Sequence, residues 1–195
     1  DFSTGFNGFT TTGSSGSATW VMNSAQPSPV SGGNAAFAQS ISTVSDQRLT
    51  SPSIALPADV EAISLKYQNR RRIESTSSEC YDGAILEISS NGGAYTQLDS
   101  AILNDPYTNT VSGSYSNPLA GKRAWCENAL RNYADTVVDL SAYAGQNVQL
   151  RWRFGSDSSA AAEGWRVDDI QVNACKASGT PLPDEIFADG FETQK

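Results

Sequence analysis

Residues 164–172, GWRVDDIQV, decide which fold we expect for this chain. Apolar side chains fall on odd positions in the first half of this stretch, at Trp165 and Val167, and on even positions in the second half. Because the side chains of a strand alternate between its two faces, one strand turns both halves to the same core only if it contains a bulge or a kink. The phase changes at two adjacent carboxylates, Asp168 and Asp169.

Strand-like alternation recurs along the chain. Residues 62–69 (AISLKYQN) and 147–154 (NVQLRWRF) alternate apolar and polar side chains, which indicates strands with one buried face. Asn91 and Gly92 separate two further strand-like runs and supply the positive φ angles of a tight hairpin turn. The positions expected to face the core are Ile63, Leu65, Tyr67, Val148, Leu150, Trp152 and Phe154.

The composition also favours strands joined by turns. Of the 195 residues, 38% are hydrophobic and 17% are charged, and no window shows a sustained helical stripe. We expect an all-β fold, a jelly-roll-like β-sandwich of two antiparallel sheets, in one domain over residues 1–175. Its first strand is expected at ATWVM (18–22), after a loose loop. Residues 176–195 lack alternation and are expected to form a C-terminal tail or linker.

Charge and missing residue types exclude several functions. The formal net charge of −8 argues against a nucleic-acid partner, because phosphate binding needs a basic surface. The chain has no histidine, which excludes Ser-His-Asp and Cys-His catalysis and ordinary catalytic zinc sites within it. There is no apolar run long enough for a transmembrane segment. Catalysis would have to use carboxylates.

Three widely spaced cysteines indicate an oxidising compartment, so we expect a secreted or cell-surface location. Cys80 and Cys126 both lie in polar, turn-like stretches beside an aromatic residue, and we expect them to form a disulfide. Cys175 would then be the odd cysteine, free or missing a partner. The alternative is three reduced structural thiols.

The acidic residues point to calcium, which takes six to eight oxygen ligands from carboxylates and backbone carbonyls. A bound cation would remove the repulsion between the neighbouring carboxylates of Asp168 and Asp169. Asp82 and Glu79 in ECYDG and Asp46 in SDQRL are further candidate ligands that separate loops would bring to one ion. The alternative is a pair of solvated aspartates at a strand end.

Arginines form the one basic signal in this acidic chain. Arg70, Arg71 and Arg72 are consecutive, and Arg151 and Arg153 lie on the outward face of an expected strand. They would hold an acidic ligand or, as we favour, lie in solvent and pair with acids on neighbouring strands, such as Glu87.

Four segments in series carry a resemblance to a known family. LTSPSIAL, YDGAILEISSNGG, NPLAGKRAWCEN and VDLSAYAGQNVQLRWRFGSDSSAAAEGWRVDDIQV resemble the MAM-like jelly-roll domain of immune inhibitor A metalloproteases. The resemblance implies a non-catalytic domain with a structural calcium ion, attached to an enzyme or surface protein. By motif position, Asp82 and the acid pair Asp168 and Asp169 match best. Cys126 stands where the family has a small residue.

Three function classes follow from these observations. The leading one is a calcium-stabilised accessory domain of a secreted bacterial protein, placed after a protease or another hydrolase and serving adhesion, substrate presentation or maturation. Its partners would be the attached catalytic domain or an extracellular protein or glycan ligand.

The alternatives are a carbohydrate-binding module and a glycoside hydrolase. For the first, alternation places Trp152 and Trp165 in the core, which leaves Trp125, Tyr107 and Tyr115 as ring platforms for sugars. The second needs two carboxyls across a cleft, and the candidate pairs are Glu79 with Asp82 and Glu163 with Asp168.

Overall fold

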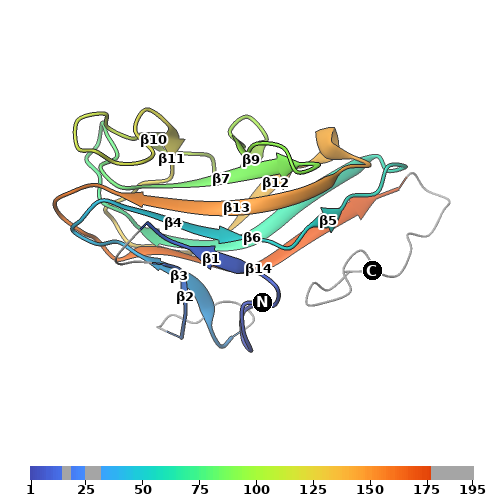
Figure 1. The fold of residues 1–195 in the computed structure, drawn as a ribbon, viewed down its shortest axis with the longest axis horizontal. Coiled ribbons are helices and arrows are strands. Elements are labelled where there is room, and N and C mark those ends of the chain that lie inside the picture. Colours follow the sequence, from blue (N-terminus) through green and yellow to red (C-terminus); the bar gives the residue numbers. More distant parts are fainter. Residues whose placement is uncertain (15–18, 25–31, 177–195) are drawn as a thin grey trace.

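The computed structural model describes residues 1–14, 19–24 and 32–176. Two large antiparallel sheets face each other (Figure 1), as expected for a β-sandwich. The helical structure in these residues consists of one 3-10 turn, Ser141–Tyr143 (η1). The described part of the chain therefore contains no helix with the length and hydropathy that crossing a bilayer requires.

The first sheet has the strand order β1-β4-β13-β7-β8, and β5 pairs with the start of β13. The second sheet has the order β2-β3-β14-β6-β12-β9. A small two-stranded ribbon, β10-β11, lies outside both. The strands of the first sheet are β1 (Thr10–Thr12), β4 (Ser45–Thr50), β5 (Ile54–Ala55), β7 (Gly83–Ser90), β8 (Thr96–Gln97) and β13 (Asn147–Ser156). Those of the second are β2 (Val21–Asn23), β3 (Ala35–Gln39), β6 (Ala62–Arg72), β9 (Ile102–Asn104), β12 (Arg131–Asp139) and β14 (Gly164–Cys175), and the ribbon joins β10 (Asn109–Thr110) to β11 (Arg123–Ala124).

Strand β14 contains the expected bulge. Asp168 lies opposite Gln68, and Gln171 lies opposite Lys66. Between these two pairs, β14 has two residues and β6 has one. Asp169 is one of these two β14 residues and has a φ of 50°, a left-handed conformation that aspartate tolerates better than most residues. The extra residue restores the phase, and both apolar halves of β14 are buried in the core.

The first residue of the deciding stretch must be glycine. Gly164 has a φ of +118°, and a Cβ at this position would lie 2.2 Å from the carbonyl oxygen of Ala38 on β3. The absence of a side chain therefore lets β14 begin while hydrogen-bonded to both β3 and β6.

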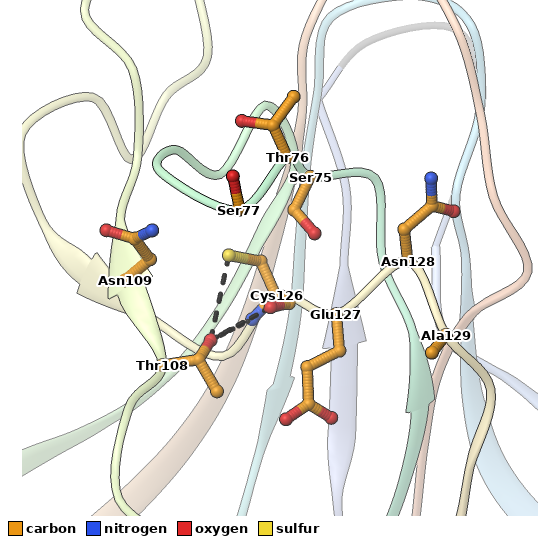
Figure 2. A pocket seen from close by; sticks show the side chains of 9 residues that line it. All are labelled: Ser75, Thr76, Ser77, Thr108, Asn109, Cys126, Glu127, Asn128 and Ala129. Carbon is orange, nitrogen blue, oxygen red and sulfur yellow. Dashed lines mark hydrogen bonds between the residues drawn. The ribbon is translucent and has the colours of Figure 1, made fainter.

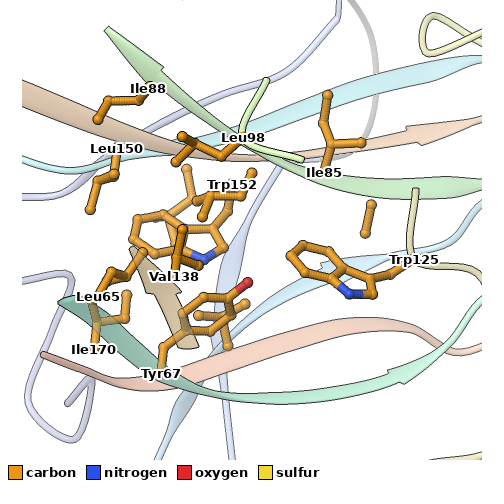
Figure 3. Packing of buried hydrophobic residues seen from close by; sticks show 14 of the residues in the cluster. Leu65, Tyr67, Ile85, Ile88, Leu98, Trp125, Val138, Leu150, Trp152 and Ile170 are labelled. Atoms are coloured by element: carbon orange, nitrogen blue, oxygen red, sulfur yellow. The ribbon is translucent and has the colours of Figure 1, made fainter. Parts of the chain in front are cut away.

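The core lies between the sheets and is rich in aromatic rings (Figure 3). All seven positions expected to face inward are buried. Tyr67 of β6 meets Trp152 of β13 edge-on at 5.6 Å between ring centroids, and Trp20 meets Trp165 at 5.2 Å. Such pairs add about 0.5–1.5 kcal/mol to the area that they bury.

The N-terminal segment belongs to the fold, contrary to the expectation of a loose loop. Thr10–Thr12 pairs with β4, and Phe2 and Phe9 are buried in the core. These phenylalanines pack edge-on at 5.3 Å, so apolar contact orders a segment that its Gly, Ser and Thr content had marked as irregular. Residues 15–18 lie outside the described residues.

Two further local expectations concern the hairpin and the tail. Asn91 and Gly92 have φ angles of 50° and 75°, and β7 and β8 pair on either side of the turn. The hairpin is confirmed, although its second strand has only two residues. The predicted tail comprises residues 176–195, of which 177–195 lie outside the described residues.

The disulfide between Cys80 and Cys126 is confirmed, with a Cα–Cα distance of 5.6 Å. It ties the loop before β7 to the segment after β11 across a sequence separation of 46. Cys175, at the end of β14, is exposed and outside any disulfide.

We expect the double variant Cys80→Ala/Cys126→Ala to lose about 2–4 kcal/mol of unfolding free energy, because the unfolded chain regains the freedom of the closed loop. Chemical denaturation measures this loss. The control Cys175→Ala removes an exposed thiol and should change the free energy by less than about 0.5 kcal/mol. A double variant as stable as this control would contradict a stabilising role for the disulfide.

The bulge gives a second prediction. Asp169→Val should lower the unfolding free energy by about 1–2 kcal/mol, because a β-branched residue is strained at positive φ. Asp169→Asn tolerates that conformation and should stay within about 0.5 kcal/mol of the parent chain. Equal stability of the two variants in urea would show that the left-handed conformation is not maintained.

Candidate functional site

Three carboxylates converge at one end of the sandwich. Glu74 and Asp82 lie in the connection between β6 and β7, and Asp157 directly follows β13. One carboxylate oxygen from each lies within 4.8 Å of the other two. Asp82 and Asp157 are 0% and 1% exposed. In the described part of the chain this is the group of acids whose spacing would allow three of them to hold one metal ion.

Hydrogen bonds fix the cluster from three loops. Asp82 accepts hydrogen bonds from the Ser40 hydroxyl at 2.6 Å and from the Asp157 backbone N–H at 2.9 Å. Asp157 accepts from the backbone N–H and hydroxyl of Ser159. Oε2 of Glu74 is buried and has no hydrogen-bond partner among the described residues. The cluster therefore retains acceptor capacity.

The electrostatics of the cluster favour a cation. The pKa of Asp82 is raised to about 7: burial is the largest cause, the hydrogen bonds from Ser40 and the Asp157 N–H lower the pKa, and the charges of Asp157 and Glu74 raise it. Burial and the charge of Asp157 also raise the pKa of Glu74. A divalent ion would relieve this repulsion and supply the partner that a buried carboxylate needs.

The five carboxylates expected to share one ion do not gather in this structure. Asp82 joins Glu74 and Asp157 instead. Asp46 lies on the outer face of the first sheet. Its carboxylate accepts hydrogen bonds from Arg153 at 2.8 and 2.9 Å and from Arg48 at 2.5 Å. Burial alone would raise the pKa of Asp46, but the hydrogen bonds and charges of these arginines hold it below its usual value. Asp46 is therefore part of an ion-pair network.

Glu79 and the acid pair of the bulge lie elsewhere. Glu79 is exposed. Asp168 is fully buried and accepts a hydrogen bond from the Phe2 N–H at 3.2 Å. Its pKa is raised to about 6: burial is the largest cause, the Asp169 charge also raises the pKa, and the backbone N–H groups of Asp169 and Phe2 and the charge of the N-terminus lower it. Calcium at Asp168 and Asp169 stays a prediction.

Sequence reasoning missed Glu74 and Asp157. Glu74 lies two residues past the end of β6, and Asp157 is the first residue past the end of β13. Both strands were predicted from their alternation, so a carboxylate just beyond each strand end was the feature that could have indicated these two residues. Which strand ends lie together, however, depends on the pairing of the strands, which the sequence alone does not reveal.

The arginines divide into two groups. Arg151 and Arg153 pair with Glu87 across the first sheet, at 2.7 and 3.4 Å, as predicted. Arg70 and Arg71 are 3% and 1% exposed, contrary to the expectation that they lie in solvent.

The Arg71 guanidinium lies in the core, where the carboxylate of Asp105 accepts hydrogen bonds from both of its terminal nitrogens. It donates to both carboxylate oxygens of Asp105, at 2.6 and 2.8 Å. Asp105 also accepts from Asn69 and Thr136, so the buried charges are compensated by hydrogen bonds as well as by each other.

The predicted aromatic platform for sugars is not formed. Trp125 is 0% exposed, and its indole N–H donates to the Asp105 carbonyl oxygen at 2.7 Å. Tyr107 is 3% exposed, and its hydroxyl accepts from the Leu86 N–H. The two rings pack 4.5 Å apart, because the disulfide and the bridge between Ala84 and Trp125 draw this segment into the core. Tyr115 is exposed at 45%, edge-on to Tyr81.

A polar cavity of about 460 Å³ lies beside the disulfide (Figure 2). Its walls come from residues 75–77, 108–109 and 126–129. Glu127 is the one carboxylate among its lining residues, whereas glycoside hydrolysis needs two. The carboxyl pairs considered for that reaction do not line it, and Glu163 is ion-paired with Arg70 and Arg166.

No family model matches the sequence. One segment of 65 residues, 31% of the chain, is 37% identical to part of Bacillopeptidase F of Bacillus subtilis (strain 168). The matched segment corresponds to 4% of that protein, so the chain covers a small fraction of its relative.

Solved structures resemble the fold. The K1 cleaved adhesin domain of Lys-gingipain from Porphyromonas gingivalis W83 matches with a TM-score of 0.51 and 16% identity, over 88% of this chain and 92% of that one. TmCBM61, solved with β-1,4-galactotriose, matches with a TM-score of 0.48 and 12% identity, over 87% and 90%. At 16% identity, the likeness to the gingipain domain shows a shared fold and nothing further. The MAM-like resemblance stays a prediction.

Proposed function

We propose that this chain is a non-catalytic accessory domain of a secreted hydrolase, stabilised by calcium, that binds an extracellular ligand. The observation that carries the proposal is how the acidic side chains of this chain are arranged and paired. In the described residues, Asp46, Asp105 and Glu163 are held in ion pairs, and the remaining gathered carboxylates form a tight, buried cluster rather than a pair across a cleft.

The comparisons support an attachment to an enzyme. The relative that shares the 65-residue segment is named a peptidase, and the gingipain domain of similar fold is named an adhesin domain. Serving adhesion, substrate presentation or maturation of an attached protease is the function that we infer from these names for this chain. The disulfide supports an extracellular location.

Calcium fits the carboxylate cluster. Hard divalent cations prefer oxygen ligands, and calcium accepts irregular arrangements of carboxylates and backbone carbonyls. Glu74, Asp82 and Asp157 would hold the ion, and the orphaned Oε2 of Glu74 is the buried acceptor that it would satisfy. A bound ion would link the ends of β6, β7 and β13 and so stabilise this end of the sandwich.

Calcium at about 100 times its Kd should stabilise the chain by about 2.7 kcal/mol, which corresponds to a rise in Tm of roughly 5–10 °C for a domain of this size. Calorimetry with calcium and with a chelator measures the rise. Asp82→Asn should abolish most of it, whereas the control Asp46→Asn should lower stability and keep the rise.

Two results would overturn the metal assignment in different ways. A Tm that is the same with calcium and with chelator would exclude a stabilising ion. A calcium effect that survives Asp82→Asn but disappears in Asp168→Asn would move the ion to the bulge.

The proposal also requires binding without turnover. We expect the full chain to co-sediment with at least one insoluble extracellular polymer, tested with cellulose, chitin, peptidoglycan and collagen, and to release no soluble sugar or peptide from any of them. Release of product would contradict the non-catalytic assignment. If the chain sediments with none of the four polymers, a binding role is contradicted.

A further inference from the structure

The polar cavity beside the disulfide is a candidate ligand site. Three separate segments form its walls: the loop after β6, the residues that enter β10, and the residues that follow β11. Its volume of about 460 Å³ falls within the range of small-molecule sites in proteins. Figure 2 shows the hydroxyls of Ser75 and Ser77 and the carboxamides of Asn109 and Asn128 around Cys126.

Most of the lining side chains carry a hydroxyl or a carboxamide, and their carbon atoms contribute apolar surface between these polar groups. Ser75, Ser77 and Asn128 make no side-chain hydrogen bond in the part of the chain that the structure describes, and the carboxamide N–H₂ of Asn109 is likewise unused. Hydroxyl and carboxamide groups each act as donor and acceptor. A ligand with several adjacent hydroxyls, which are also donors and acceptors, would pair with this set.

The charge around the cavity favours a neutral ligand. Glu127 is the one charged residue in the lining. Its carboxylate lies 3.3 Å from Arg131 Nη1 and 3.4 Å from Nε of the buried Arg71. These ion pairs neutralise the carboxylate, so it provides little attraction for a cation, while the net charge of −8 disfavours an anion.

The walls are held in place before any ligand arrives. The Cys80–Cys126 disulfide joins two of them, and the Ile73 N–H donates to the Glu127 carbonyl oxygen at 2.8 Å. The Thr108 hydroxyl donates to the Cys126 carbonyl oxygen and accepts from the Cys126 N–H, both at 2.9 Å (Figure 2). A rigid site loses less conformational entropy on binding, which matters most for a ligand held by hydrogen bonds alone.

We propose that this cavity binds a neutral saccharide through hydrogen bonds from serine and asparagine side chains, without stacking on an aromatic ring. The inference rests on the proposed function as an extracellular binding domain and names its ligand class and site. A peptide fits less well, because peptide recognition uses a strand edge or pockets for side chains and Ala129 is the one aliphatic residue in the lining.

The experiment is an NMR titration of the ¹⁵N-labelled full chain, in calcium, with β-1,4-galactotriose, cellotriose, xylotriose, mannotriose and, as a peptide control, trialanine. We expect at least one trisaccharide to shift the amide signals of residues 75–77, 108–109 and 126–129. Asn109→Ala and Asn128→Ala should each raise its Kd about 2- to 10-fold, the effect of losing one or two neutral hydrogen bonds.

Asn147→Ala is the matched control. Asn147 is exposed and begins β13, whereas the loop that lines the cavity leads into β7, whose first residue pairs with Gly155 near the other end of β13. The control substitution should leave the Kd unchanged. Asn128→Ala and Asn147→Ala replace exposed side chains, so their Tm should equal that of the parent chain. Asn109→Ala also removes the acceptor of the Thr110 N–H, so its Tm is measured beside its Kd to separate a binding defect from unfolding.

Three outcomes would overturn the inference and leave the proposed function standing. Saccharide-induced shifts centred on Tyr115, or unchanged Kd values for both cavity variants, would place the sugar elsewhere. Shifts of the cavity signals with trialanine alone would assign it to peptides. Absence of any shift with the trisaccharides, in a chain that still sediments with collagen, would exclude the saccharide class.

Discussion

The register between β14 and β6 is the constraint on which the second sheet depends. β14 pairs with β6 from Gly164 to Cys175 and with β3 over its first four residues. Without the bulge at Asp169, the second half of β14 would turn Ile170 and Val172 away from the core. A one-residue slip in a two-sided strand exchanges its apolar and polar faces, so one residue at positive φ keeps both halves of the longest strand buried.

Most of the sandwich could be predicted because its strands alternate. The bulge, the hairpin at Asn91, the inward faces of β6 and β13 and the Cys80–Cys126 pairing are all local signals, and the structure confirms them. Trp125 and Arg71 were misjudged for a common reason. Each is buried by a partner distant in sequence, namely the bridge to Ala84 for Trp125 and the Asp105 carboxylate for Arg71.

The candidate site was harder to foresee than the fold. Carboxylates from separate loops do gather in one cluster, although calcium there stays a prediction, and the members of the cluster depend on which strand ends meet. Asp82 was singled out because it stands in the YDG motif, whereas Glu74 and Asp157 were marked only by their places just beyond the end of a predicted strand. The polar cavity has even less signal, since serine and asparagine in a loop are ordinary turn residues.

The outermost strands of both sheets are short. β1, β2 and β9 have three residues each and β8 has two, while the long strands β6, β13 and β14 have neighbours on both sides. The unpaired N–H and C=O groups of an edge strand can hydrogen-bond to the backbone of another molecule and so extend the sheet. A short edge strand offers too few hydrogen bonds to hold such a molecule. In the described residues, the short outermost strands therefore limit the length of edge on which another copy of the chain could extend either sheet.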